Sequence, residues 1–346
     1  WDLVPSQRER GGDFSVTTDR QGRPFRIYDS LTTQPSGGGY VRDPFPGNLI
    51  PGSRHDAVAL NAMKFYPLPN KVPTPENWSN FEHANPTGLN WASLSTRVDH
   101  QLSSAHTLFL RYGWNHRFDP SEPYYGECCR EAGNPTGGQD LFDRGNISAG
   151  AGHTWVKSAR TVIDFRAGFT RYIEADRLFG EGFDLTRLGF PESLTRAMGF
   201  AVFPSFGLGG DVQNLGEGRV AQHWFHNLYH ALVTAHALVA RHALKYGLRH
   251  QVQQVNVFYP GRAGGYYVFD RVLTRGPDPT RTAVNSGHSA ASFLLGTPSS
   301  GLVNWNAYMA LQNRFTAFFF QDDWRVAGRL ALNLGLRLEH EGPVTD

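Results

Sequence analysis

Residues 318–326 and 330–338 alternate between apolar side chains and polar or small ones. Leucine occupies every second position of 330–338, with alanine, asparagine, glycine and arginine between. The run 318–326 has the same period, and Asp322 is the one charged residue on its apolar side. A period of two places successive side chains on opposite faces of a β-strand. We therefore expect a hairpin whose strands are joined by a tight turn at 327–328.

The length of this hairpin fits two environments. Residues 330–338, at about 3.3 Å each and a tilt of about 40°, rise roughly 23 Å. This rise is close to the ~25 Å apolar band of an outer-membrane barrel. A half-buried hairpin in a soluble β-sandwich would show the same alternation, so this hairpin alone leaves both interpretations open.

The composition excludes several classes of protein. The mean hydropathy of −0.41 and the 13% of aromatic residues fit neither a helical membrane protein nor a disordered chain. The sequence has no apolar run of about eighteen residues, so no transmembrane helix is expected. The net charge of +2 argues against nucleic acid as a partner, because phosphate binding needs a basic surface. The 38 glycines and 21 prolines fit a β protein with long loops.

Three further hairpins follow from the same alternation. Their strand pairs are 94–102 with 107–115, 146–155 with 163–170, and 226–239 with 244–252. The last pair is rich in alanine and leucine, so propensity would also allow an amphipathic helix there. We interpret 226–252 as a hairpin because its neighbours along the chain are hairpins.

The connections between these strands differ systematically in length. Short turns are expected within the hairpins, at 103–106, 157–160, 240–241 and 327–328, whereas the segments 118–143, 174–222 and 256–312 between hairpins are long. Outer-membrane barrels have this asymmetry, with the short turns on the periplasmic side. It favours a membrane barrel over a soluble sandwich. Aromatic residues near the strand ends fit interfacial girdles: Tyr112, Trp114, Trp155, Tyr172, Trp224 and Trp324.

The first 90 residues are predicted to be mainly an external loop, and 91–346 to consist of hairpins and loops. Only 54–65 has helical character, with Ser53 as the N-cap and an end before Pro67.

The only cysteines are the neighbours Cys128 and Cys129. A vicinal disulfide is one alternative, and two free thiols in a loop are what we expect. The chain begins at Trp1, without methionine or a signal peptide, and ends soon after a predicted strand. We therefore expect it to be a fragment of a longer protein.

The opening hairpin also carries a resemblance to a known family. The sequence FQDDWRV at 320–326, followed by LALNLGLR at 330–337, resembles the paired strands of TonB-dependent outer-membrane receptors. It is most similar to their Oar-like branch, which carries a carboxypeptidase-regulatory-like domain at the N-terminus. Shorter matching phrases occur in the expected order, at 9–15, 43–51, 97–100, 188–191 and 291–296.

The resemblance implies an all-β fold that is part of a 22-stranded transmembrane antiparallel β-barrel with long extracellular loops. In such receptors an N-terminal plug fills the barrel, and a periplasm-spanning TonB-type energising protein engages a short box near the N-terminus. We expect 1–346 to be a fragment of the barrel domain, without the plug and the N-terminal domain.

The same resemblance implies a location in the bacterial outer membrane. The implied partners are outer-membrane lipid, the plug domain of the parent chain, the TonB-type protein and an unknown large solute. The implied function is energised uptake of a large nutrient, such as a glycan, a peptide or a chelated metal. The alternative is a non-transporting surface protein that acts in adhesion.

Sequence patterns for catalysis and cofactors are missing. The sequence has no Gly-x-Ser-x-Gly elbow, and 207–210 and 261–265 do not fit a phosphate-binding loop. On a strand, His226 and His230 would lie about 13 Å apart at ~3.3 Å per residue, too far to share a zinc ion. On the alternative helix they could share one. We expect no enzyme activity, no cofactor and no metal site.

Charged residues alternate with the apolar ones and are expected to line a wet lumen. These residues are Arg97, Asp99, Asp164, Arg166, Lys245, Arg249, Asp323, Arg325, Arg337 and Glu339. A hydrated network packed against the plug is the interpretation we favour, and a path for a polar solute is the alternative.

Overall fold

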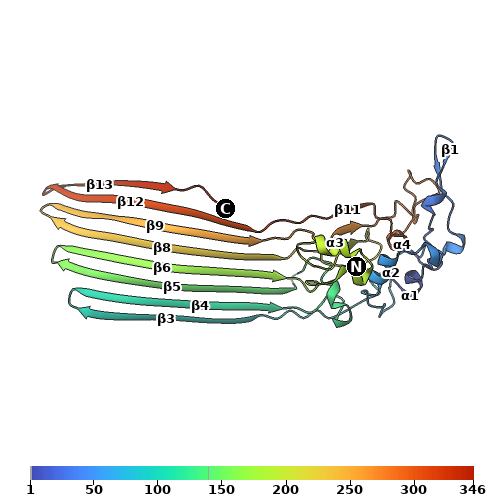
Figure 1. Cartoon of the computed structure of the whole chain (residues 1–346), viewed down its shortest axis with the longest axis horizontal. Coiled ribbons are helices and arrows are strands. Elements are labelled where there is room, and N and C mark those ends of the chain that lie inside the picture. Colours follow the sequence, from blue (N-terminus) through green and yellow to red (C-terminus); the bar gives the residue numbers. More distant parts are fainter. Residues whose placement is uncertain (1, 139) are drawn as a thin grey trace.

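An eight-stranded antiparallel sheet dominates the computed structural model, which describes residues 2–138 and 140–346. Its strand order is β13-β12-β9-β8-β6-β5-β4-β3, so long strands that follow one another in the chain are neighbours in the sheet. The strands are β3 (Asn90–Ser103), β4 (His106–Pro120), β5 (Leu141–Ser158), β6 (Thr161–Arg177), β8 (Gln222–Val239), β9 (His242–Phe258), β12 (Met309–Ala327) and β13 (Leu330–Glu341). Figure 1 shows the hairpin turns at one end of the sheet, here called the turn end. The rest of the chain gathers at the other end, the loop end.

The structure confirms the four predicted hairpins, β3–β4, β5–β6, β8–β9 and β12–β13. Residues 226–252 are strands, and the helix alternative is wrong. β8 is paired with β6 on one side and β9 on the other, and these two ladders outweigh the helix propensity of its alanines. The fourth turn lies at Gly328-Arg329, one residue later than expected, because an irregularity between Arg325 and Ala327 extends β12.

The strands reach further toward the loop end than predicted. β5 begins at Leu141 and has 18 residues, and β6 continues to Arg177 and has 17. The added part of β5 carries Asp143 and Arg144 on opposite faces, so alternation between apolar and polar residues ends before the ladder does. About 9–11 residues suffice for a tilted strand to cross a bilayer. Strands of this length therefore extend beyond the bilayer.

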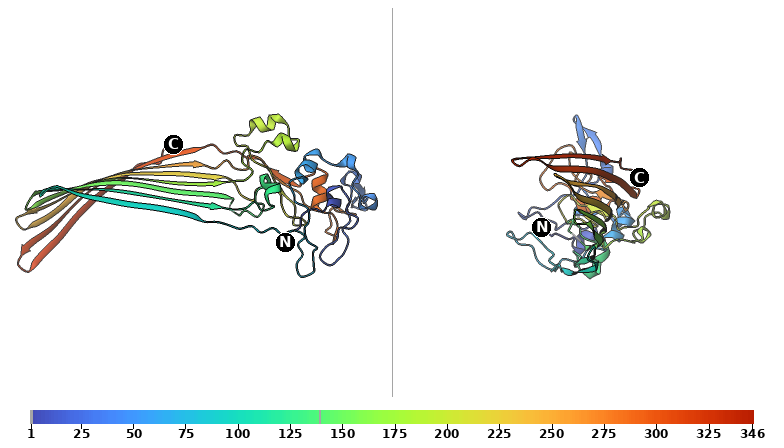
Figure 2. Two further views of the ribbon diagram at one scale, coloured as in Figure 1. Left: turned by 90° about the horizontal axis from the view of Figure 1, so that it is seen from below. Right: turned by 90° about the vertical axis from the view of Figure 1, so that its left-hand side faces the viewer.

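The chain at the loop end folds into a body beyond the end of the sheet (Figure 2). This body has its own hydrophobic core. Its helices are α1 (Gln7–Arg10), α2 (Ala57–Met63), α3 (Glu192–Ala197) and α4 (Ser289–Leu294), with 3₁₀ turns η1 (Ser30–Thr32), η2 (Pro46–Asn48), η3 (Gly52–Arg54), η4 (Glu127–Ala132) and η5 (Leu185–Leu188). Its strands are β1 (Gln34–Ser36), β2 (Gly39–Val41), β7 (Ser205–Gly207), β10 (Tyr266–Val268) and β11 (Ser300–Leu302). None of the described helices is long and apolar enough to cross a membrane.

The first 90 residues contribute much of this core, so they are more ordered than a surface loop. Phe14 and Ile27 are fully buried and pack in one cluster with Phe203 and Phe293 from distant parts of the chain. The helix predicted over 54–65 is the shorter α2. Its N-cap is Asp56, whose side chain accepts a hydrogen bond from the backbone N–H of Ala59, and the expectation of Ser53 as N-cap is wrong.

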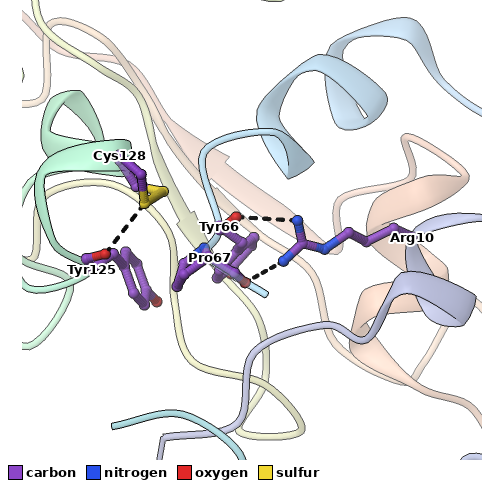
Figure 3. Close-up of a disulfide and its surroundings, with 6 residues drawn as sticks. Arg10, Tyr66, Pro67, Tyr125 and Cys128 are labelled. Carbon is purple, nitrogen blue, oxygen red and sulfur yellow. Dashed lines mark hydrogen bonds between the residues drawn. A yellow bond between two sulfur atoms is a disulfide. The ribbon is translucent and has the colours of Figure 1, made fainter. Parts of the chain in front are cut away.

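Cys128 and Cys129 form a vicinal disulfide within η4, so the prediction of two free thiols is wrong. Cys129 is buried in the loop-end core, and the Sγ atom of Cys128 lies 3.5 Å from the carbonyl oxygen of Tyr125 (Figure 3). Nearby, the Arg10 guanidinium donates a hydrogen bond of 3.1 Å to the carbonyl oxygen of Tyr66. It also donates one to the carbonyl oxygen of Pro67. The disulfide therefore belongs to the packed part of the loop end.

Candidate functional site

The pairing register places all ten predicted lumen residues on one face of the sheet, here called the polar face. One row across all eight strands consists of Glu339, Ala317, Arg249, Leu232, Arg166, Gly152, Phe109 and Asp99. Residues two positions away along a strand share this face, because the side-chain period is two. Four of the ten predicted residues lie in this row, and the other six are related to it by such steps.

The opposite, apolar face is mainly hydrophobic through its middle. One row across it consists of Leu338, Phe318, Leu248, Val233, Phe165, His153, Leu108 and His100. Its leucines on β13 have no protein cover among the described residues, and Leu336 is 75% exposed. A continuous exposed apolar surface needs a nonaqueous neighbour, because water around it costs free energy.

The discordant Asp322 lies on the apolar face and is paired. Its Oδ2 atom is 2.7 Å from Nδ1 of His242, and the His242 ring stacks on Trp324 with 5.3 Å between centroids. The pair lies two rows from the turn end, where a charged or polar side chain can still reach an aqueous interface. The apolar face therefore continues along β12 on both sides of Asp322.

The aromatic residues predicted to form girdles are divided between the two faces. The register places Trp155 and Trp324 on the apolar face near the turn end, and Tyr112 and Trp114 on the same face toward the loop end. Tyr172 and Trp224 lie on the polar face, so their assignment to a girdle is wrong. Both residues lie just outside the predicted alternating runs, 163–170 on β6 and 226–239 on β8.

Three of the predicted residues meet in one groove on the polar face. Lys245, Arg249 and Arg337 line a depression of about 620 Å³ between β8, β9, β12 and β13. The guanidinium of Arg337 is also paired with the carboxylate of Glu339. Three cations with a single paired anion give this groove a positive potential.

The other predicted residues lie outside that groove. Arg97 and Asp99 form an ion pair of 2.7 Å, and the Arg97 guanidinium lies over the Phe109 ring at 4.4 Å from its centroid. Asp164 accepts a hydrogen bond of 2.6 Å from the hydroxyl of Thr154. Asp323 and Arg325 lie near the turn end of β12. The face thus combines local polar pairs with one cationic groove.

Comparison with protein families decides what this two-faced sheet is. A family model described as an outer membrane beta barrel domain matches residues 1–346. The chain is an outer membrane beta barrel domain. Its location is therefore the bacterial outer membrane, where the apolar face of a barrel strand meets lipid and the other face meets the interior. A comparison with curated protein sequences found no match.

The outer membrane beta barrel domain is also similar to solved structures. One is P. aeruginosa FpvA in an iron complex with a pyoverdine (11% identity, TM-score 0.41, 75% of this chain and 32% of that chain). Another is the ferric-catecholate import receptor Fiu from E. coli K12 (12% identity, TM-score 0.38, 73% and 34%). A third is the outer membrane transporter YddB from Escherichia coli (9% identity, TM-score 0.28, 92% and 38%). The chain thus spans about a third of the length of the solved structures it matches.

The barrel domain has further charged residues on its polar face that were not predicted to line a lumen. Arg111 lies opposite Arg97 in the β3–β4 register, and the alternation alone could have indicated it. Arg144 and Glu174 form an ion pair of 3.2 Å near the loop end. They were missed because they lie on strand extensions where both faces are polar.

Histidine and carboxylate groups of the barrel domain form no metal cluster in 2–138 and 140–346. His226 and His230 lie on the same face of one strand, as expected for the strand interpretation. Glu217 is a buried acid at the loop end, and it accepts hydrogen bonds from the backbone N–H groups of Asn134 (3.1 Å) and Gly180 (3.4 Å). Burial raises the pKa of Glu217 well above its usual range, and the neighbouring Asp140 carboxyl raises it further.

Proposed function

We propose that this outer membrane beta barrel domain is the barrel segment of a TonB-dependent receptor of the Oar-like branch, which takes up a large nutrient. The observation that carries the proposal is the charged face that runs along the membrane-spanning strands. A protein that only anchors loops needs an apolar outside, but it has no need of a cationic groove such as the one at Lys245, Arg249 and Arg337. The ten predicted residues are proposed to line the lumen.

The free edges of the sheet support a larger barrel. Among the described residues, β3 and β13 are each paired on one side only. Unpaired N–H and C=O groups cannot find partners in hydrocarbon, so both edges need further strands within a bilayer. We propose that strands outside 1–346 complete a 22-stranded barrel and that the plug of the parent chain fills it.

The cationic groove gives the lumen a chemical preference. Lys245 and Arg249 attract carboxylate or phosphate groups, and Arg337 can bind such groups in a bidentate manner. Acidic side chains of the plug would pair with the cations of this groove when no solute is bound. An acidic or polar solute would contact the same cations as it passes through the barrel. The TonB-type protein is proposed to engage the N-terminal box of the parent chain, and no catalytic step is proposed.

Uptake by whole cells tests this proposal. A strain lacking the gene would be complemented with the full-length protein, or with the same protein lacking its N-terminal box. Three fluorescent probes are supplied separately: an oligosaccharide, a peptide mixture and an iron–siderophore complex. Accumulation of at least one probe only with the intact protein is the expected result. Equal accumulation in all strains would contradict uptake of these solute classes.

A second candidate function is adhesion, which the folded loop end favours. Its core buries residues from across the chain, among them Phe14, Phe203 and Phe293, so the proposed outer surface is rigid enough to present a fixed contact surface. The same strains distinguish the two functions. Loss of surface attachment in the deletion strain, restored equally by both forms of the protein, would support adhesion.

A further inference from the structure

Four rings stack on one another in sequence on the apolar face near the turn end. Their centroids are 5.8 Å apart for Trp155 and His106, 5.2 Å for His106 and His153, and 6.0 Å for His153 and Phe165. Nδ1 of His106 lies 3.0 Å from Nε2 of His153, so one imidazole donates a hydrogen bond to the other. This bond uses one nitrogen of each ring and leaves the second nitrogen of each for an outside partner.

Cations lie along the turn end of the sheet. The Nζ atom of Lys157 lies 5.8 Å from the centroid of the Trp155 ring, which places it on the apolar face. Three of the four hairpin turns carry an arginine, namely Arg160, Arg241 and Arg329. None of the four turns contains a carboxylate in the sequence. The turn end therefore offers a positive rim to a negatively charged surface.

An apolar groove begins where the stack ends. It has a volume of about 470 Å³, and its floor is made of the small residues Ala151, Ala167 and Ala231 on neighbouring strands. Val98 and Leu110 bound it toward the β3 edge. The groove crosses the five strands β3, β4, β5, β6 and β8, and His153 and Phe165 of the stack line its side nearer the turn end. An acyl chain shares the apolar character of this groove.

We propose that this surface, the turn-end groove, holds one anionic phospholipid. The phosphate is placed over the stack, where the His106–His153 pair supplies ring N–H donors and Lys157, beside Trp155, supplies a cation. One acyl chain lies in the groove over Ala167. The proposal rests on the barrel of the proposed function and on the orientation expected from the connection lengths, in which the short turns face the periplasm and hence the phospholipid leaflet. It does not require that the protein transports a solute.

Lipid binding to the full-length protein tests the proposal. The protein is purified in a mild detergent and titrated with phosphatidylglycerol or with phosphatidylcholine of the same acyl chains, and bound lipid is counted by native mass spectrometry. Lys157→Gln removes the cation and Ala167→Leu fills the groove. Lys64→Gln at the loop end and Ala92→Leu on the apolar face outside the groove are the matched controls. Ala231→Val replaces Ala167→Leu if that variant fails to fold.

The expected result is one tightly held phosphatidylglycerol and an affinity for phosphatidylcholine at least fivefold lower. Lys157→Gln and the groove variant should each lower the affinity for phosphatidylglycerol at least fivefold, and both controls should match the wild type. Equal affinity for the two lipids would overturn the anionic site. Equal affinity in the wild type and the groove variant would overturn the acyl-chain groove. Both outcomes are independent of uptake, so they are distinguishable from failure of the proposed function.

Discussion

Single residues of the loop end hold protons that they would lose in water. Glu217 is 2% exposed, and burial together with Asp140 raises the pKa of its carboxyl. The unfolded carboxyl loses its proton at about pH 4.3, whereas the folded one keeps it to higher pH. The folded state thus binds more protons above that pH, and its stability falls as pH rises toward the folded pKa.

Glu217→Gln should remove this dependence. The amide keeps an oxygen that can accept from Asn134 or Gly180 and carries no charge to bury. We expect the variant to match the wild type near pH 5 and to exceed its free energy of unfolding by about 1–3 kcal/mol at pH 8. Chemical denaturation of the full-length protein at both pH values measures this, with Glu192→Gln on exposed α3 as a control. A variant less stable than the wild type at pH 8 would contradict the assignment.

The Asp322–His242 pair makes a second prediction at residue scale. Oδ1 of Asp322 is buried without a hydrogen-bond partner, so the pair gains less than a fully satisfied one. Asp322→Leu alone should cost about 1 kcal/mol, because it leaves His242 unpaired. The double variant with His242→Leu should cost nothing or stabilise, since buried ion pairs rarely outperform apolar packing. Refolding titrations of the variants in lipid vesicles measure these free energies of unfolding. A double variant less stable than Asp322→Leu would contradict the prediction.

At the scale of elements, alternation was sufficient for the hairpins but not for the loop end. Each long strand shows a period of two outside its loop-end extension. Strand pairs and faces, including the ten residues of the polar face, could therefore be predicted from the sequence. The loop-end core uses single aromatics such as Phe14, Phe206 and Phe293, spaced without a period. Their meeting depends on long-range packing that local patterns do not encode. The disulfide was one of two alternatives for a similar reason, since two adjacent cysteines do not reveal their backbone conformation.

The two ends of the sheet should face opposite sides of the outer membrane. A protease site inserted at Val284, which is 73% exposed at the loop end, should be cleaved on intact cells. The same site in the turn Ala159-Arg160 should be cleaved only after the outer membrane is permeabilised, because periplasmic turns are shielded. Immunoblotting of the full-length protein reports both results. Cleavage of the turn site on intact cells would invert the topology.

The whole molecule should behave as part of a closed barrel. We expect the full-length protein to fractionate with outer membranes and to migrate differently on gels before and after heating. A closed barrel keeps every backbone group paired and resists detergent until it is heated. Membrane fractionation followed by unheated and heated electrophoresis measures this. Recovery of the intact protein in a detergent-free soluble fraction would contradict it.

The apolar face of the sheet should meet lipid and the polar face the barrel interior, and substitutions on β13 test this most directly. Leu336 lies mid-strand on the apolar face opposite Phe320, whereas Leu334 lies opposite Asp322, whose carboxylate could compensate a new cation. Leu336→Arg is therefore the cleaner substitution. Asn333 lies on the polar face opposite Asp323 and is the matched control.

Refolding titrations of the full-length protein in lipid vesicles compare these variants. Leu336→Arg should cost about 2–4 kcal/mol, because a cation near the bilayer midplane loses its hydration. Leu334→Arg should cost less, and Asn333→Arg should stay within about 0.5 kcal/mol of the wild type, since its side chain remains in water. Equal costs at Leu336 and Asn333, or a larger cost at Asn333, would show that this face of the sheet does not meet lipid.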